Sequence, residues 1–345
     1  MTDKVCEFVS ECPKDDSLTT RTCMDVYVDF SRGFVYKAVG GNSASLVVCG
    51  ITGKDSNLFA VYDRHFGICE YYGIEMITVK CTETGPDMDA VEELVKDPAV
   101  KGMWCVPKYS NPEGITYSDE TVKRIAALKP AATDFRVFWD NAYAVHDFYD
   151  NIKLLNIIDE CENAGNPNMP IMFASTSKIS YPGAGVACLV SSVNNIKAIL
   201  KRLTIQSISY DKVNMLRHVK FFKNVDGIKE HMKLHAKILK PKFDAVIDTL
   251  NSDLAGLGIA EWNEPNGGYF ISLDVTGGSA SRVGVLCKEA GVTLTNVGAT
   301  FPYGKDPTDS NIRIAPTFPT PEVLSKAVKV LTVSVKLACL ENLTR

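Results

Sequence analysis

Short apolar runs alternate with amphipathic stretches from about residue 100 onward. Gly102–Val106 has the pattern of a buried strand, and the pattern returns at Phe135–Trp139, Ile171–Ala174 and Val186–Val190. Between the first two runs, Ser118 is placed to cap a helix that has acidic residues in its first turn. Strands that alternate with helices predict an α/β fold, in which a mostly parallel sheet carries helices on both faces.

The C-terminal third has a different pattern. A long helical stretch from about Ile228 to Ala255 contains Pro241, which predicts a kink or a break at that point. The elements expected after it are strands at Gly267–Asp274, Val292–Thr295 and Asn311–Ala315, and helices near 280–290 and from about 321 to 340. This order predicts a smaller second α/β domain.

These patterns divide the chain into three parts. We expect a short N-terminal segment at 1–40, a large domain at 41–225, and a connecting helix with a small C-terminal domain at 226–345. No internal repeat and no low-complexity linker separates them.

Composition narrows the class of protein. Apolar residues make up 46% of the 345 residues and charged residues 23%, which is typical of a folded chain. The net charge is 37 − 41 = −4, so no basic excess favours a nucleic-acid partner. No apolar run approaches the ~18 residues of a membrane span. Charges interrupt the N-terminal sequence MTDKVCEFVSECPKDD too often for a signal peptide, so a cytoplasmic protein is expected.

Cysteine and histidine give no metal-binding pattern. The 11 cysteines form no CxxC pair, and Cys105 and Cys188 lie within apolar runs, which favours small reduced core residues. His231 and His235 are four residues apart on the long helix, but no further ligand accompanies them. We therefore predict no metal site.

Polar residues follow several of the predicted strands. Asn111, Asp140 and Ser175 each lie just after a strand, where a parallel sheet places its ligand-binding groups. Ser175-Thr176-Ser177-Lys178 could hold a phosphate with hydroxyls and form a Schiff base with the lysine, although an ordinary surface lysine would have the same local sequence. Asp140 could keep a pyridinium nitrogen protonated, or could simply cap a helix.

Asn111 and Arg313 can each be explained without a ligand. The segment from Asn111 to Gly114 can be a plain turn. Arg313 lies inside an apolar strand, where its charge needs an anionic partner. A substrate carboxylate would suit its planar fork, and an internal acidic residue is the alternative.

The order of these pieces resembles one known family. This is the chain order of the class I aminotransferases, which are pyridoxal-phosphate enzymes of fold type I. In them an asparagine comes first, and Asp-x-x-Tyr, Ser-x-Ser-Lys and an arginine in a strand follow in that order. The segments SNPEGITYSDE, WDNAYAVHDF, FASTSKISYPGAGVA, GGYFISLDV and GATFPYGKDP–NIRIAP are similar to the MocR-like and alanine–glyoxylate aminotransferase group, some members of which act on aspartate. The resemblance runs from about Tyr62 to the C-terminus.

The resemblance implies a set of catalytic residues and a cofactor, pyridoxal 5′-phosphate. Lys178 would form the Schiff base and move a proton between the substrate α-carbon and the cofactor. Asp140 would pair with the pyridine nitrogen, while Tyr143 and Asn111 would hydrogen-bond the ring oxygen. Arg313, helped by Asn111, would bind the substrate α-carboxylate.

The remaining cofactor contacts follow from the same resemblance. Ser175 and Ser177 would contact the phosphate, Tyr62 would stack on the ring, and Gly41-Asn42-Ser43 would form a phosphate loop. Many class I enzymes add an arginine seven or eight residues after the lysine, where this chain has Gly185 and Val186. The phosphate is therefore expected to be held by hydroxyls and amides.

The implied activity is transamination between an amino acid, with aspartate-like side chains favoured, and a 2-oxo acid through pyridoxamine phosphate. Another pyridoxal-phosphate reaction such as β-elimination and a weak or inactive paralogue are the alternatives. A DNA-binding regulator is disfavoured because no winged-helix domain fits before residue 41.

The segment Gln206–Phe222 resembles a dimer-interface stretch, so a homodimer is expected. Since only 40 residues precede Gly41, a shortened N-terminal region with slow turnover and a looser dimer is expected as well.

Overall fold

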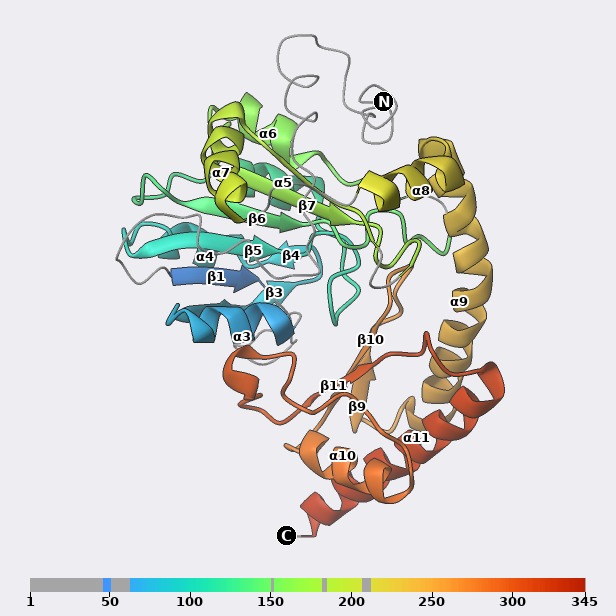
Figure 1. Ribbon diagram of the computed structural model, residues 1–345. Helices are drawn as coiled ribbons and strands as arrows, with labels where there is room; N and C mark the ends of the chain where they lie inside the picture. Colours follow the sequence, from blue (N-terminus) through green and yellow to red (C-terminus); the bar gives the residue numbers. More distant parts are fainter. Residues whose placement is uncertain (1–45, 51–62, 150–151, 182–184, 207–211, 345) are drawn as a thin grey trace.

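The computed structural model describes residues 46–50, 63–149, 152–181, 185–206 and 212–344 (Figure 1). Within this part, a six-stranded sheet has the order β2-β1-β5-β6-β7-β8. Its strands are β1 (Leu46–Gly50), β2 (Met76–Val79), β5 (Val100–Cys105), β6 (Arg136–Asp140), β7 (Pro170–Ser175) and β8 (Ala187–Ser191).

All neighbouring strands in this sheet are parallel except the last pair. β8 runs antiparallel to β7, with Ser175 opposite Ala187 and Ile171 opposite Ser191. The parallel pairs place Trp104 beside Phe138 and Asp140 beside Phe173. The prediction of an α/β fold with a mostly parallel sheet is confirmed.

Helices lie around this sheet (Figure 1). They are α3 (Asp63–Tyr71), α4 (Met88–Leu94), α5 (Asp119–Ala126), α6 (Ile157–Asn163) and α7 (Val193–Gln206), and a small hairpin of β3 (Cys81–Thr82) and β4 (Gly85–Pro86) precedes α4. The predicted cap is present, because the Ser118 hydroxyl accepts a hydrogen bond from the Thr121 amide at 3.1 Å. Asp87 caps α4 in the same way.

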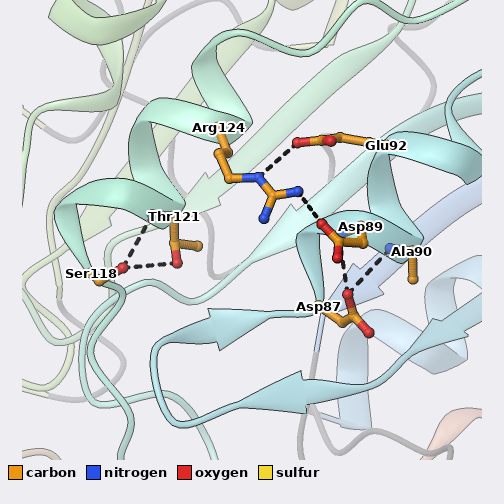
Figure 2. A network of polar contacts seen from close by, with 7 residues as sticks. All are labelled: Asp87, Asp89, Ala90, Glu92, Ser118, Thr121 and Arg124. Atoms are coloured by element: carbon orange, nitrogen blue, oxygen red, sulfur yellow. Dashed lines mark hydrogen bonds and ion pairs between the residues drawn. The ribbon is translucent and has the colours of Figure 1, made fainter.

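An exposed ion-pair network joins α4 to α5 (Figure 2). Arg124 donates from Nε to Glu92 at 2.8 Å and from Nη2 to Asp89. Because these groups are largely in water, the network contributes little to stability and mainly fixes how the two helices lie.

A second group of elements follows the sheet. It contains α8 (Lys212–Phe222), α9 (Val225–Leu254), β9 (Ala260–Trp262), β10 (Ile271–Val275), α10 (Ala280–Glu289), the 3₁₀ turn η3 (Pro302–Gly304), β11 (Asn311–Ile314) and α11 (Pro321–Leu343). β10 pairs antiparallel with both β9 and β11. In Figure 1, α9 runs from the large sheet down to this smaller antiparallel sheet.

Two hydrophobic cores underlie the two sheets. One is built on the large sheet and includes Val137, Trp139 and Ile125, and the other includes Leu250 and Leu273. The domain boundaries at residues 40 and 225 stay predictions. The seven described cysteines are free, six of them buried, as expected for reduced core residues.

Three predicted elements differ from the structure. α9 is continuous across Pro241, so the predicted break is wrong, while the alternative of a kink stays a prediction. Packing of Phe243, Val246 and Leu250 into the C-terminal core outweighs the one hydrogen bond that proline cannot make. The predicted strand at Val292–Thr295 is wrong: this segment has no strand partner, and its apolar side chains pack on the core without pairing.

The third difference is the start of the strand predicted at Gly267–Asp274. β10 begins only at Ile271, because the two glycines ahead of it are used in another contact. Gly267 forms an isolated antiparallel bridge with Asp147, and Gly268 has a φ of +81°. The segment before β10 therefore lies against the segment after β6.

Candidate active site

The carboxyl ends of three neighbouring strands define the candidate site. β6 ends at Asp140 and β7 at Ser175, and the chain after β5 reaches Asn111 within a buried turn. Because β5, β6 and β7 are adjacent and parallel, these ends lie at one edge of the sheet. The predicted grouping at the strand ends is thus present in the fold.

Lys178 and Asp140 form the charged centre of the site. The Lys178 amine lies over the Tyr143 ring, with Nζ 4.5 Å from the ring centroid. Burial lowers the pKa of Lys178 and the charge of Asp140 opposes that change. Burial likewise raises the pKa of Asp140, opposed by the charge of Lys178. The two groups therefore sense each other in a poorly solvated place, which is typical of reactive sites.

Ser175 and Ser177, on either side of Thr176, form a turn whose hydroxyls and amide could bind an anion. Their hydroxyl oxygens lie 2.8 Å apart, and the Ser177 amide donates to Ser175 Oγ at 3.1 Å. Gly185 approaches this turn so closely that a Cβ there would lie 2.4 Å from Ser177 Oγ. A side chain at 185 would therefore displace Ser177, which is a steric reason for the glycine that this chain has where many class I enzymes have an arginine.

Arg313 approaches the same edge from the smaller sheet. It lies in β11 opposite Ser272 of β10. Its Nη1 donates to Asn111 Oδ1 at 3.1 Å, and its guanidinium carbon lies 4.8 Å from the centroid of the Phe270 ring. The structure thus brings Arg313 and Asn111 together, as the proposed carboxylate site requires.

Four predicted site residues lie outside the described residues. These are Gly41, Asn42, Ser43 and Tyr62. Their roles stay predictions.

The structure adds contacts that the sequence reasoning missed. The backbone carbonyl of Lys178 accepts hydrogen bonds from His146 and Tyr269, and His231 donates to the next carbonyl, that of Ile179, at 2.9 Å. His146 and Tyr269 lie inside the segments WDNAYAVHDF and GGYFISLDV, which are the signal that could have identified them.

Two negative findings concern the described residues alone. No three histidine, cysteine or acidic side chains converge there as metal ligands, and the His231 and His235 rings of α9 lie tilted against each other, with centroids 4.6 Å apart and an interplanar angle of 54°. None of the helices in those ranges has both the length and the apolar character that crossing a bilayer requires.

Comparison with known proteins gives a consistent result. The family model described as aspartate amino-transferase matches residues 54–345. An aspartate aminotransferase of Corynebacterium glutamicum is 49% identical over 282 residues, which cover 81% of this chain. The chain spans 65% of the length of that relative, which is less than two thirds.

Solved structures share the fold. The crystal structure of an aspartate transaminase from C. glutamicum matches with a TM-score of 0.82 at 45% identity, covering 87% of this chain and 69% of that one. LysN, an α-aminoadipate aminotransferase of Thermus thermophilus crystallised with N-(5′-phosphopyridoxyl)-L-leucine, matches with a TM-score of 0.74 at 20% identity, covering 88% and 74%. At 20% identity, the second match supports the fold alone.

Proposed function

The chain belongs to the aspartate aminotransferase family, and on that premise we propose that it is a pyridoxal-phosphate-dependent aminotransferase. Its substrates would be an aspartate-like amino acid and a 2-oxo acid. The observation that carries the proposal is the placement of the Lys178 amine over the Tyr143 ring, within the electrostatic reach of Asp140. This arrangement supports a reactive amine beside a buried negative charge.

The described residues fit pyridoxal phosphate. Burial raises the pKa of Asp140, so its carboxylate is stabilised by a positive partner such as a protonated pyridine nitrogen. Ser175 and Ser177 offer hydroxyls for a phosphate, and Gly185 leaves the space that a side chain would fill. When bound, the cofactor would supply an aldehyde that condenses with amines and a ring that accepts electrons from the substrate α-carbon.

Lys178 is the proposed proton carrier. Burial lowers the pKa of its amine, which increases the fraction of the neutral base near neutral pH. The neutral amine would take the proton from the substrate α-carbon and deliver it to the bound cofactor, and it would carry the proton the opposite way in the reverse half-reaction. The Tyr143 ring beneath Nζ limits the directions in which the amine can lie.

Arg313 and Asn111 are the proposed binders of the substrate α-carboxylate. A guanidinium can bind a carboxylate with two parallel hydrogen bonds. The contact with Asn111 holds the guanidinium at the mouth of the strand-end site, and the Phe270 ring supports it from another side. In this proposal the substrate α-carbon would lie between Arg313 and Lys178.

We further propose that the protein works as a homodimer. Two-fold dimers are the commonest symmetric assemblies. α8 carries exposed Val213 and Phe221, which a second subunit could cover. Sedimentation of the purified chain at several concentrations tests this, and a single monomeric species throughout would contradict it.

Borohydride trapping tests the function. The chain mixed with pyridoxal phosphate should absorb near ~420 nm, lose this band with aspartate and regain it with a 2-oxo acid. Reduction followed by peptide mapping should place the adduct on Lys178, and Lys178→Ala should abolish both the adduct and turnover. Lys233→Ala, which changes an exposed lysine of α9, is the matched control and should retain both. An adduct on any lysine other than Lys178 would refute the assignment.

A further inference from the structure

The peptide carbonyl of Lys178 accepts two side-chain hydrogen bonds from different parts of the chain. Tyr269 Oη donates at 2.8 Å and His146 Nε2 at 3.2 Å. Because a carbonyl only accepts, the proton of neutral His146 must be on Nε2. His146 Nδ1 is buried and has no hydrogen-bond partner among the residues that the structure describes.

Both donors keep their protons over a wide pH range. Burial lowers the pKa of His146 to about 4, so the ring is neutral at physiological pH. Burial raises the pKa of Tyr269, so its hydroxyl stays protonated. The two hydrogen bonds onto the Lys178 carbonyl are therefore not expected to switch near neutral pH.

The same two rings contact the ring below the lysine amine. The His146 ring meets Tyr143 edge-on at 5.5 Å between centroids and meets Tyr269 edge-on at 5.3 Å. The Tyr143 and Tyr269 rings are 6.0 Å apart. Tyr143, His146 and Tyr269 thus form a triangle of rings, and Lys178 contacts it at the carbonyl and at the amine.

Two glycines allow the triangle to form. The Gly268 amide donates to the His146 carbonyl at 2.9 Å, beside the bridge between Asp147 and Gly267. A Cβ at Gly267 would lie 2.3 Å from the His146 carbonyl oxygen, and a side chain at Gly268 would be strained at its positive φ. The segment before β10 can therefore lie against the segment after β6 only because it has no side chains at these two positions.

Asp147, the neighbour of His146, is itself fixed. It accepts a hydrogen bond from Tyr109 Oη at 2.6 Å and pairs with the buried Lys108 amine at 2.8 Å. These side-chain contacts fix Asp147, whereas His146 itself is held at its carbonyl by the Gly268 amide and contacts Lys178 through its ring.

We propose that His146 and Tyr269 are positioning residues that fix the Lys178 peptide and thereby aim its amine; this inference rests on the proposed role of Lys178. A lysine side chain has many rotamers, so the place of its amine depends on how firmly its Cα is held. Neither residue needs to touch the substrate. Their effect should therefore appear in the rate of the reaction and in the state of the lysine more than in substrate binding.

The test uses the full chain with pyridoxal phosphate and four variants. Tyr269→Phe removes only the donor hydroxyl, and His146→Leu removes the other donor at a similar volume. His146→Gln keeps an N–H donor and is the rescue variant. Tyr109→Phe is the matched control, because it removes a buried hydroxyl of the adjacent network that does not contact Lys178.

Three readouts separate positioning from general loss of structure. They are the pH midpoint of the visible cofactor band, kcat against KM, and the reactivity of the Lys178 amine in the cofactor-free chain with a small acylating agent, mapped by mass spectrometry. Tyr269→Phe and His146→Leu should each lower kcat about tenfold with little change in KM, within the ~100-fold range of a misplaced catalytic group. Both should shift the band midpoint and the labelling of Lys178, while Tyr109→Phe should change neither.

The outcomes are distinct. Wild-type-like midpoints, labelling and kcat in both Tyr269→Phe and His146→Leu would overturn the positioning role and leave the proposed function standing. Failure of the wild-type chain to form a reducible adduct on Lys178 would overturn the proposed function instead. If His146→Leu does not fold, Tyr269→Phe and the recovery in His146→Gln decide the question. Equal defects in Tyr109→Phe would indicate a structural effect only and would also refute the proposal.

Discussion

The lysine end and the arginine end of the candidate site are held in different ways. Lys178 lies between the antiparallel strands β7 and β8, and its peptide carbonyl accepts hydrogen bonds from His146 and Tyr269. Arg313 lies within β11 and meets Asn111 through side-chain atoms. The contacts from His146 and Tyr269 hold the Lys178 peptide itself, whereas those from Asn111 and Phe270 hold the tip of the Arg313 side chain, so we expect a rigid chemical end and an adaptable binding end.

The largest effect is expected from a change of charge at the lysine end. Asp140→Asn removes the negative charge that opposes the lowered pKa of Lys178 and would stabilise a pyridinium nitrogen. We expect kcat to fall roughly 10²–10⁴-fold, the range of positioned proton chemistry, with little loss of stability. Steady-state rates beside thermal melting measure both quantities. An unchanged kcat would contradict the proposed role of the Asp140 charge in the reaction.

Acid should loosen the lysine end. Burial lowers the pKa of His146 to about 4, below its ordinary value of 6.5, so between these values the unfolded chain binds a proton that the folded chain does not. The free energy of unfolding should therefore fall as pH drops from 6.5 toward 4, by at most about 3.5 kcal/mol, since one pKa unit corresponds to about 1.4 kcal/mol.

His146→Gln isolates this contribution. Its stability should change less across the same window, although His65, whose pKa is also lowered by burial, titrates there in both proteins. Urea unfolding of both proteins at a series of pH values makes the comparison. Parallel curves would mean that His146 does not stabilise the lysine end.

At the arginine end, a conservative change should act mainly on binding. Arg313→Lys keeps the charge but loses the planar fork that binds a carboxylate in two places. We expect KM for the amino acid to rise by a factor equivalent to about 2 kcal/mol, with a smaller change in kcat. A fall in kcat larger than the rise in KM would contradict the assignment of substrate binding to the arginine end and of chemistry to the lysine end.

The smallest effect on activity should come from the titration of Glu113 at the arginine end, which acts on stability instead. Burial raises the pKa of Glu113 well above its ordinary value, and the charge of Asp274 adds to this. Between the ordinary and the raised pKa, the folded chain keeps a proton that the unfolded chain has lost, so stability falls as pH rises through this window. Glu113→Gln should flatten the fall, whereas Glu120→Gln, an exposed change in α5, should not.

The parts predicted from the sequence are those with a local pattern. The buried strands at β5, β6 and β7 follow from uninterrupted apolar runs, and the cap at Ser118 follows from one hydroxyl and the acidic turn after it. The strand ends then placed Asp140 and Ser175 at one edge of the sheet. No local pattern predicts the antiparallel direction of β8, since an apolar run reads the same either way.

The contacts around Lys178 could not be derived in that way. His146 is 32 residues from Lys178 and Tyr269 is 91, so no periodicity links them. The prediction of a strand at 292–295 is wrong for a related reason. Its apolar side chains cover the core, and burial alone does not distinguish a paired strand from a packed loop. Long-range contacts decide both cases.

The antiparallel pairing of β7 with β8 has a consequence for the order of folding. Ser175 and Ala187 are close in sequence as well as in space, so the turn that carries Lys178 needs only a short loop to close. Asn111 and Arg313 are 202 residues apart, and their contact requires both cores to be in place. We therefore expect the lysine turn to form early and the arginine contact late during folding, because contacts between distant residues are the slow ones.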